Sequence, residues 1–192
     1  MQFIGDFSID PGVCERLIEL HRACDRRGLV KPGTLHVDGK GRTVDRDRKD
    51  SLDLLLSEVP GELQAEYGVP EYQRELERCA MEYFKRFPNL ANAQFAIREP
   101  PAIQHYRPGG GFKAEHCERI GLAGCTRGLV WMTFLNDVTD EGGTRFVYQD
   151  AKFEARKGRT LIWPTDFTHT HVGVVSPTQH KYIITGWFNF LK

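Results

Sequence analysis

The chain has 192 residues, enough for one compact domain with an apolar core and few for two, so we expect a single domain over residues 1–192. Its 26 Lys and Arg residues balance its 26 Asp and Glu residues, which leaves no excess positive charge to attract a nucleic acid or an anionic membrane surface. The 5 cysteines include no C-x-x-C pair, and no leader or apolar run of about 18 residues is visible, so we expect a cytoplasmic protein without a membrane segment.

The first half of the chain has mainly helical patterns. Apolar residues recur at helical spacing from about Pro11 to Arg26, and Asp10-Pro11 is a typical helix start. Residues 31–49 are rich in Gly, Asp, Arg and Lys and predict an exposed connection. Residues 69–87 predict a second amphipathic helix. We therefore expect residues 1–100 to be mainly helical support.

After Pro101 the pattern changes to short β-type segments separated by Gly-containing turns. They cover residues 102–107, 112–119, 128–137, 144–150, 152–156, 159–164, 170–175 and 180–190. Segments of this length and spacing are typical of a sandwich or barrel of antiparallel strands. The expected fold is mainly β with N-terminal helices, and residues 101–192 form the β core that holds the site.

Candidate metal ligands lie on two of these segments. His116 and Glu118 are two residues apart, and on a strand such residues project from the same face. Alone, this pair is as typical of a surface ion pair. His169 and His171 provide further imidazoles, and the spacing between them leaves both open as a third ligand. Two histidines and a carboxylate leave three adjacent positions free on iron(II), although zinc accepts the same ligands.

A lysine shares one face of the last predicted strand with apolar residues. On an extended segment 180–190, Lys181, Ile183, Thr185 and Trp187 point to the same side. A buried ammonium group needs an anionic partner. That partner is either a ligand carboxylate or a protein acid such as Asp166.

The segment from about Gln104 to Phe190 resembles the 2-oxoglutarate and iron(II) dependent dioxygenases of the prolyl 4-hydroxylase type. A Tyr-x-x-Gly segment precedes the first ligand pair in YRPGGGFKAEHCE, and a Gly-Gly turn follows a hydrophobic strand in WMTFLNDVTDEGGTRF. The distal His171 lies ten residues before Lys181, and Trp187 follows six later. This chain of spacings selects His171 over His169.

The resemblance implies a double-stranded β-helix core of the jelly-roll or cupin-like type. It implies Fe(II) bound by His116, Glu118 and His171, with 2-oxoglutarate as cosubstrate and O2 as oxidant. No catalytic side chain is expected beyond these ligands. The implied activity is hydroxylation of an unactivated C–H bond in a peptide, an amino acid or a small molecule.

The resemblance also suggests residues around the cosubstrate. Lys181 would pair with the distal carboxylate of 2-oxoglutarate, Tyr106 would reach the cosubstrate, and Thr185 on the face of Lys181 would hydrogen-bond nearby. Trp187 corresponds to a position near the substrate in prolyl hydroxylases. Arg107 is a further candidate at the substrate entrance.

The sequence departs from the family pattern at two positions. Glu118 replaces the usual Asp ligand, which adds one methylene group, and Val130 stands where a threonine is common. A non-catalytic metal-binding or sensor protein on the same fold and a zinc hydrolase are the alternative functions. The runner-up enzyme is a nucleic-acid dealkylating oxygenase on the same fold. Such enzymes typically use an arginine anchor, whereas this chain has Lys181, is neutral and ends in GWFNFLK. No pattern indicates an oligomeric state.

Overall fold

The computed structural model describes residues 3–37 and 41–191, and its largest element is an antiparallel sheet. This main sheet is 8-stranded, and β7 (Phe95–Ala96) pairs with β15 beside the main path. The order along the path is β1 (Gly5–Ser8), β13 (Arg159–Pro164), β10 (Arg127–Phe134), β15 (Lys181–Phe190), β8 (Ala102–Tyr106), β6 (Leu52–Leu55) and β2 (Lys31–Pro32).

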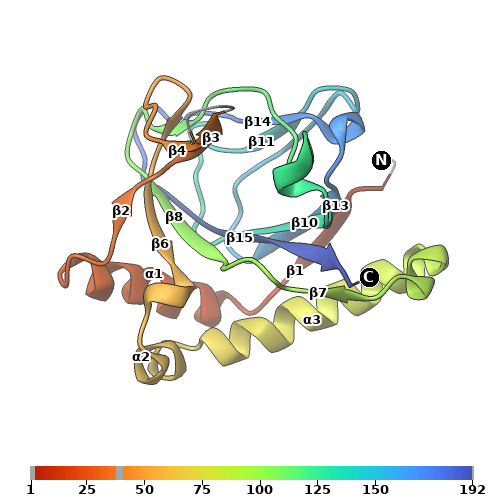
Figure 1. Ribbon diagram of the computed structural model, residues 1–192. Helices are drawn as coiled ribbons and strands as arrows, with labels where there is room; N and C mark the ends of the chain where they lie inside the picture. The colour runs from red at the N-terminus through yellow and green to blue at the C-terminus, as the bar shows by residue number, and fades with distance from the viewer. Residues whose placement is uncertain (1–2, 38–40, 192) are drawn as a thin grey trace.

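A smaller sheet faces the main sheet on the side away from the long helices (Figure 1). It contains β12 (Ala151–Phe153), β11 (Thr144–Phe146) and β14 (His171–Gly173), in that order. Two short pairs complete the strands: β3 (Leu35–Val37) with β4 (Gly41–Thr43), and β5 (Lys49–Asp50) with β9 (Gly111–Phe112). The two facing sheets form a double-stranded β-helix core, which confirms the predicted fold class.

The helices cover the outer face of the main sheet (Figure 1). They are α1 (Pro11–Asp25), α2 (Gly61–Glu66) and α3 (Val69–Arg86). Four 3-10 turns lie elsewhere along the chain: η1 (Leu56–Glu58), η2 (Pro88–Asn92), η3 (Leu122–Gly124) and η4 (Phe167–His169). The Asp10 side chain accepts a hydrogen bond from the Gly12 amide at 2.7 Å, which caps α1 where the sequence predicts its start. Both long helices were predicted within one residue of their observed ends.

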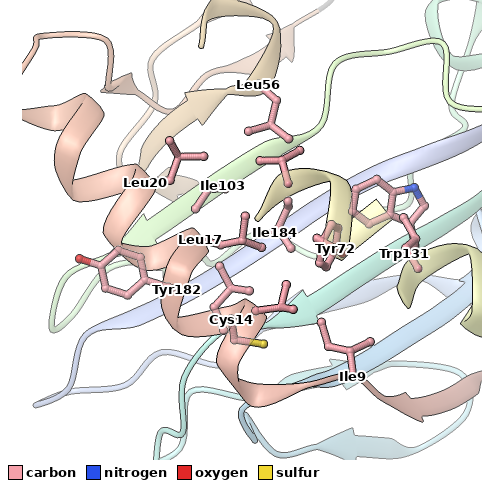
Figure 2. Close-up of a cluster of buried hydrophobic side chains, with 14 of the residues drawn as sticks. Ile9, Cys14, Leu17, Leu20, Leu56, Tyr72, Ile103, Trp131, Tyr182 and Ile184 are labelled. Carbon is pink, nitrogen blue, oxygen red and sulfur yellow. The ribbon is translucent and has the colours of Figure 1, made fainter. Parts of the chain in front are cut away.

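Alternation along the strands creates two separate apolar cores. On β10, Leu129 and Trp131 pack toward the helices, while Val130, Met132 and Phe134 pack between the two sheets. Figure 2 shows the helix-side core, where α1 side chains face Ile103 and Ile184 of the main sheet. The core between the sheets surrounds the site described below.

The first half contains more strand than the sequence predicts. Strands β1, β2 and β6 extend the main sheet, and segment 31–49 carries β2, β3 and β4 rather than a structureless connection. Residues 38–40 of that segment lie outside the described residues. These strands escape a pattern search because each has only two to four residues. Among the described residues, no helix has the length and hydropathy needed to cross a bilayer.

Candidate metal and cosubstrate site

Three predicted ligands converge at one point between the sheets. The Glu118 Oε1 atom lies 3.5 Å from His116 Nε2 and 3.7 Å from His171 Nε2. One donor atom from each residue lies within 4.8 Å of the others. Two imidazoles and one carboxylate at this spacing fit a facial triad for iron(II).

Backbone contacts fix the orientation of both imidazole rings. His116 and His171 face each other in an isolated antiparallel bridge, with amide-to-carbonyl distances of 3.0 and 2.9 Å. Nδ1 of His116 donates to the Ala114 carbonyl at 2.9 Å, and Nδ1 of His171 donates to the His169 carbonyl at 3.0 Å. A carbonyl oxygen only accepts, so Nδ1 carries the proton in each ring. The Nε2 lone pairs are therefore free to bind a metal.

The charge states of the triad suit metal binding. Burial raises the pKa of Glu118, but its contacts with His116, His171 and Arg127 outweigh the burial and lower the pKa to about 2. Burial and the nearby His116 lower the pKa of His171 to about 4. A carboxylate and a neutral imidazole are the forms that ligate a metal at neutral pH.

Segment 112–119 is less regular than predicted. Only β9 and the single bridge at His116 have strand pairing there, because the amides of Glu118 and Arg119 both donate to the Thr165 carbonyl at 3.0 Å. The prediction of a continuous strand was wrong. The ligands still meet because the bridge to β14 and the Thr165 contacts replace the strand ladder.

Lys181 is buried without a carboxylate partner among the described residues. Lys181 is only 4% exposed. Its Nζ atom donates to the Val174 carbonyl at 3.3 Å and lies 4.9 Å from the centre of the Tyr106 ring. The alternative partner Asp166 instead pairs with Arg119 at 3.4 Å. Burial lowers the pKa of Lys181 to about 8. The ammonium group is thus available to an anionic ligand.

A cavity of about 980 Å³ joins the triad to Lys181. Tyr106, Thr185 and Trp187 also line it. The Tyr106 hydroxyl donates to Gln104 Oε1 at 2.6 Å, and the Thr185 hydroxyl donates to the Trp131 carbonyl at 2.9 Å. Their roles toward the cosubstrate stay predictions.

Arg107 differs from the other predicted site residues. It is exposed and does not line the cavity. Its charge contributes to lowering the pKa of His105, which packs near His21 on the outer side of the sheet. Its predicted contact with substrate stays a prediction.

Two residues of the site were missed by the sequence analysis. Arg127 and Glu99 line the cavity and form an ion pair whose closest atoms are 2.5 Å apart. Arg127 begins β10 and Glu99 lies in a loop before Pro100, so no periodic pattern links them. Only the tertiary fold brings this pair beside Glu118, where Arg127 Nη1 lies 3.8 Å from Oε2.

Comparison with known proteins agrees with this geometry. Residues 101–189 match the family model of the 2OG-Fe(II) oxygenase superfamily. No curated protein matches the chain.

Several solved structures share the fold. A prolyl-4-hydroxylase from Pseudomonas putida has a TM-score of 0.71 at 17% identity, over 97% of this chain and 92% of that one. A viral collagen prolyl hydroxylase from Paramecium bursaria Chlorella virus-1, solved with 2-oxoglutarate, has a TM-score of 0.67 at 15% identity, over 99% and 97%. A Trichoplax adhaerens prolyl hydroxylase in complex with a hypoxia inducible factor peptide has a TM-score of 0.71 at 15% identity, over 96% and 83%. At these identities the likeness is one of fold.

The superfamily match spans all three triad residues and the buried lysine. The donor set fits iron(II), and the buried ammonium, which has no carboxylate partner among the described residues, fits a dicarboxylate. Residues 101–189 therefore match the 2OG-Fe(II) oxygenase superfamily, the chain shares the fold of solved prolyl hydroxylases, and its triad fits the Fe(II) that this superfamily uses with 2-oxoglutarate.

Proposed function

We propose that the protein hydroxylates an unactivated C–H bond of a peptide substrate, with a prolyl residue as the first candidate. The observation that carries the proposal is that one cavity holds an iron-type triad and a buried lysine that pairs with no carboxylate of the described residues. A free amino acid or small molecule is the alternative substrate class, and the experiment below distinguishes them.

The chain's own residues supply binding and orientation. His116, Glu118 and His171 hold the metal, and Lys181 pairs with the distal carboxylate of 2-oxoglutarate. When bound, iron(II) supplies the activation of dioxygen that is coupled to conversion of 2-oxoglutarate to succinate and carbon dioxide. Three protein ligands would leave the rest of the coordination sphere to cosubstrate and oxygen.

The walls of the cavity limit access of water to the reacting atoms. Apolar side chains of the main sheet line it, and these are almost fully buried: Val130, Met132, Phe134, Trp163 and Ile183. Excluding water strengthens the electrostatic contacts in the site and limits side reactions of reactive intermediates. This lining therefore directs oxidation toward the bound substrate.

The size and rim of the cavity support a substrate larger than the cosubstrate. About 980 Å³ is at the upper end of the range of about 300–1,000 Å³ found for small-molecule pockets, so room remains after 2-oxoglutarate binds. Charged residues of segment 31–58, including Arg42, Arg48 and Glu58, line the outer part. The Trichoplax adhaerens relative, a prolyl hydroxylase, is solved with a peptide.

We further propose a reducing, cytoplasmic setting and no nucleic-acid partner. All five cysteines are free, and three of them are buried. The balanced charge of the chain supports a substrate that is not a polyanion.

The test is incubation of the protein with iron(II), 2-oxoglutarate and air, together with proline-containing peptides or free amino acids. We expect succinate to form in step with a gain of one oxygen atom on a peptide, measured by mass spectrometry. His116→Ala and His171→Ala should reduce both signals to background, because each removes a metal ligand. His180→Ala, which alters an exposed histidine outside the cavity, should retain both. Undiminished turnover in either ligand variant would refute the proposal, and oxygen gain only on free amino acids would favour the alternative.

A further inference from the structure

We infer that Trp187 and Arg127 form a positioning pair that holds the Glu118 carboxylate so that one oxygen faces the metal and the other is fixed to the protein. The inference rests on the metal site proposed above and adds two residues that act through Glu118 rather than on substrate. It also accounts for a glutamate at a position where the family usually has aspartate.

The two carboxylate oxygens of Glu118 have different partners. Oε1 lies 3.5 and 3.7 Å from the two imidazole Nε2 atoms. Oε2 points away from them and accepts a hydrogen bond from the Trp187 indole Nε1 at 3.0 Å. The side chain is thus arranged as a monodentate ligand before a metal arrives.

Arg127 holds the indole and the Glu118 backbone at the same time. Its guanidinium carbon lies 3.7 Å from the centre of the Trp187 ring. Nη1 donates to the Glu118 carbonyl at 3.1 Å and lies 3.8 Å from Oε2. One residue therefore contacts the ligand's main chain, lies near its side chain and stacks on its hydrogen-bond donor.

Hydrogen bonds to Glu99 fix the orientation of the Arg127 guanidinium group. Nε and Nη2 donate to the two oxygens of Glu99 at 2.8 and 2.5 Å, and Asn189 Nδ2 donates to Glu99 Oε1 at 3.0 Å. The Arg127 side chain is only 18% exposed. Such a two-pronged, partly buried pair has a defined geometry, which a lysine cannot reproduce.

A glutamate ligand needs this support more than an aspartate does. Its extra methylene adds a rotatable bond, and ordering it costs conformational entropy when the metal binds. The Glu118 amide donates to the Thr165 carbonyl at 3.0 Å, the carbonyl accepts from Arg127, and the carboxylate accepts from Trp187. With main chain and side chain both fixed, little of that cost remains at the binding step.

The test measures Mn(II) affinity of the full chain by calorimetry, without substrate or turnover. Trp187→Phe keeps an aromatic ring for Arg127 but removes the donor to Oε2, and we expect Mn(II) to bind about 10- to 100-fold more weakly. The matched control is Trp131→Phe, since the Trp131 Nε1 is buried without a hydrogen-bond partner among the described residues. It should leave Mn(II) affinity unchanged.

A second variant separates positioning from folding. Arg127→Lys keeps the charge but loses the two hydrogen bonds to Glu99 and the stacking of the guanidinium on the Trp187 ring. We expect this variant to bind Mn(II) more weakly, while the melting temperature of its apo form stays close to that of Trp131→Phe. Combined with Trp187→Phe, its effect on affinity should be less than additive, because both act on Glu118. In the anaerobic Fe(II)–2-oxoglutarate complex, Trp187→Phe should also shift the visible charge-transfer absorption.

Specific outcomes would overturn the inference. Wild-type Mn(II) affinity in Trp187→Phe would do so, as would equal losses in Trp187→Phe and Trp131→Phe. A wild-type protein that binds no Mn(II) would overturn both the metal site and the inference. The protein could bind Mn(II) tightly in a way that depends on Trp187 and yet hydroxylate no tested substrate. That result would support the inference and refute the proposed substrate.

Discussion

The two faces of β15 lie in different environments, although their residues alternate along one strand. Tyr182, Ile184 and Phe188 belong to the core between the main sheet and the helices. Lys181 and Thr185 point to the cavity between the sheets. The outer face is completed by the protein's own side chains, whereas the inner face keeps a buried charge that the described residues do not neutralise. The outer face therefore stabilises the fold, whereas the inner face lowers its stability and is kept for ligand binding.

The first way to test this comparison is to damage the outer face alone. Leu17 on α1 is fully buried in the helix-side core, so Leu17→Ala should lower the free energy of unfolding by about 2–5 kcal/mol. Urea unfolding measures this change. Turnover of 2-oxoglutarate per folded molecule should stay the same, because α1 contributes no residue to the cavity lining.

The control uses the same substitution at an exposed leucine. Leu122 is 90% exposed, so Leu122→Ala should change stability by no more than about 0.5 kcal/mol. A large loss of turnover in Leu17→Ala with unchanged stability would contradict the separation of the two faces.

The second test removes the unpaired charge from the inner face. The pKa of Lys181 falls from 10.5 to about 8, which corresponds to a destabilisation of about 3 kcal/mol at neutral pH. Lys181→Met should therefore raise the free energy of unfolding by about 1–3 kcal/mol, although it removes the proposed cosubstrate contact. A less stable variant would show that Lys181 has a protein partner after all.

The pH dependence of this gain follows from the sign of the shift. Between pH 8 and 10.5 the unfolded chain keeps the Lys181 proton that the folded chain has lost, so the contribution of Lys181 to the stability of the wild type rises with pH in that window. Burial raises the pKa of Cys14 to about 12 and that of Cys79 to about 11, which lowers stability over part of the same range. Both proteins share these thiols. The difference in unfolding free energy between Lys181→Met and wild type should thus shrink from pH 8 to pH 10.5.

The sequence was sufficient for the features that depend on local period. The two-residue period of a strand predicts Lys181 and Thr185 on one face and Tyr182 and Ile184 on the other, as observed. Helical period and the Asp10-Pro11 start defined α1. The resemblance over residues 104–190 supplied the choice of His171, which lies in the triad, over His169.

Features that depend on tertiary contacts were not predictable. Arg127 lies beside Glu118 because β10 pairs with β15, with a register shift between Arg127 and Leu129, and because the Glu118 amide bonds to Thr165. Strands β1 and β6 have four residues each and gain their strand geometry from pairing with β13 and β8. Local propensity carries no signal for such partners.

The most direct test of the account is the affinity of Mn(II)-loaded protein for 2-oxoglutarate at pH 7, in wild type and Lys181→Met. Loss of a buried charge pair predicts binding about 100-fold weaker in Lys181→Met, with Mn(II) affinity unchanged because the triad is intact. Equal affinity of the two proteins for 2-oxoglutarate would contradict the claim that the buried ammonium of Lys181 is kept for the cosubstrate.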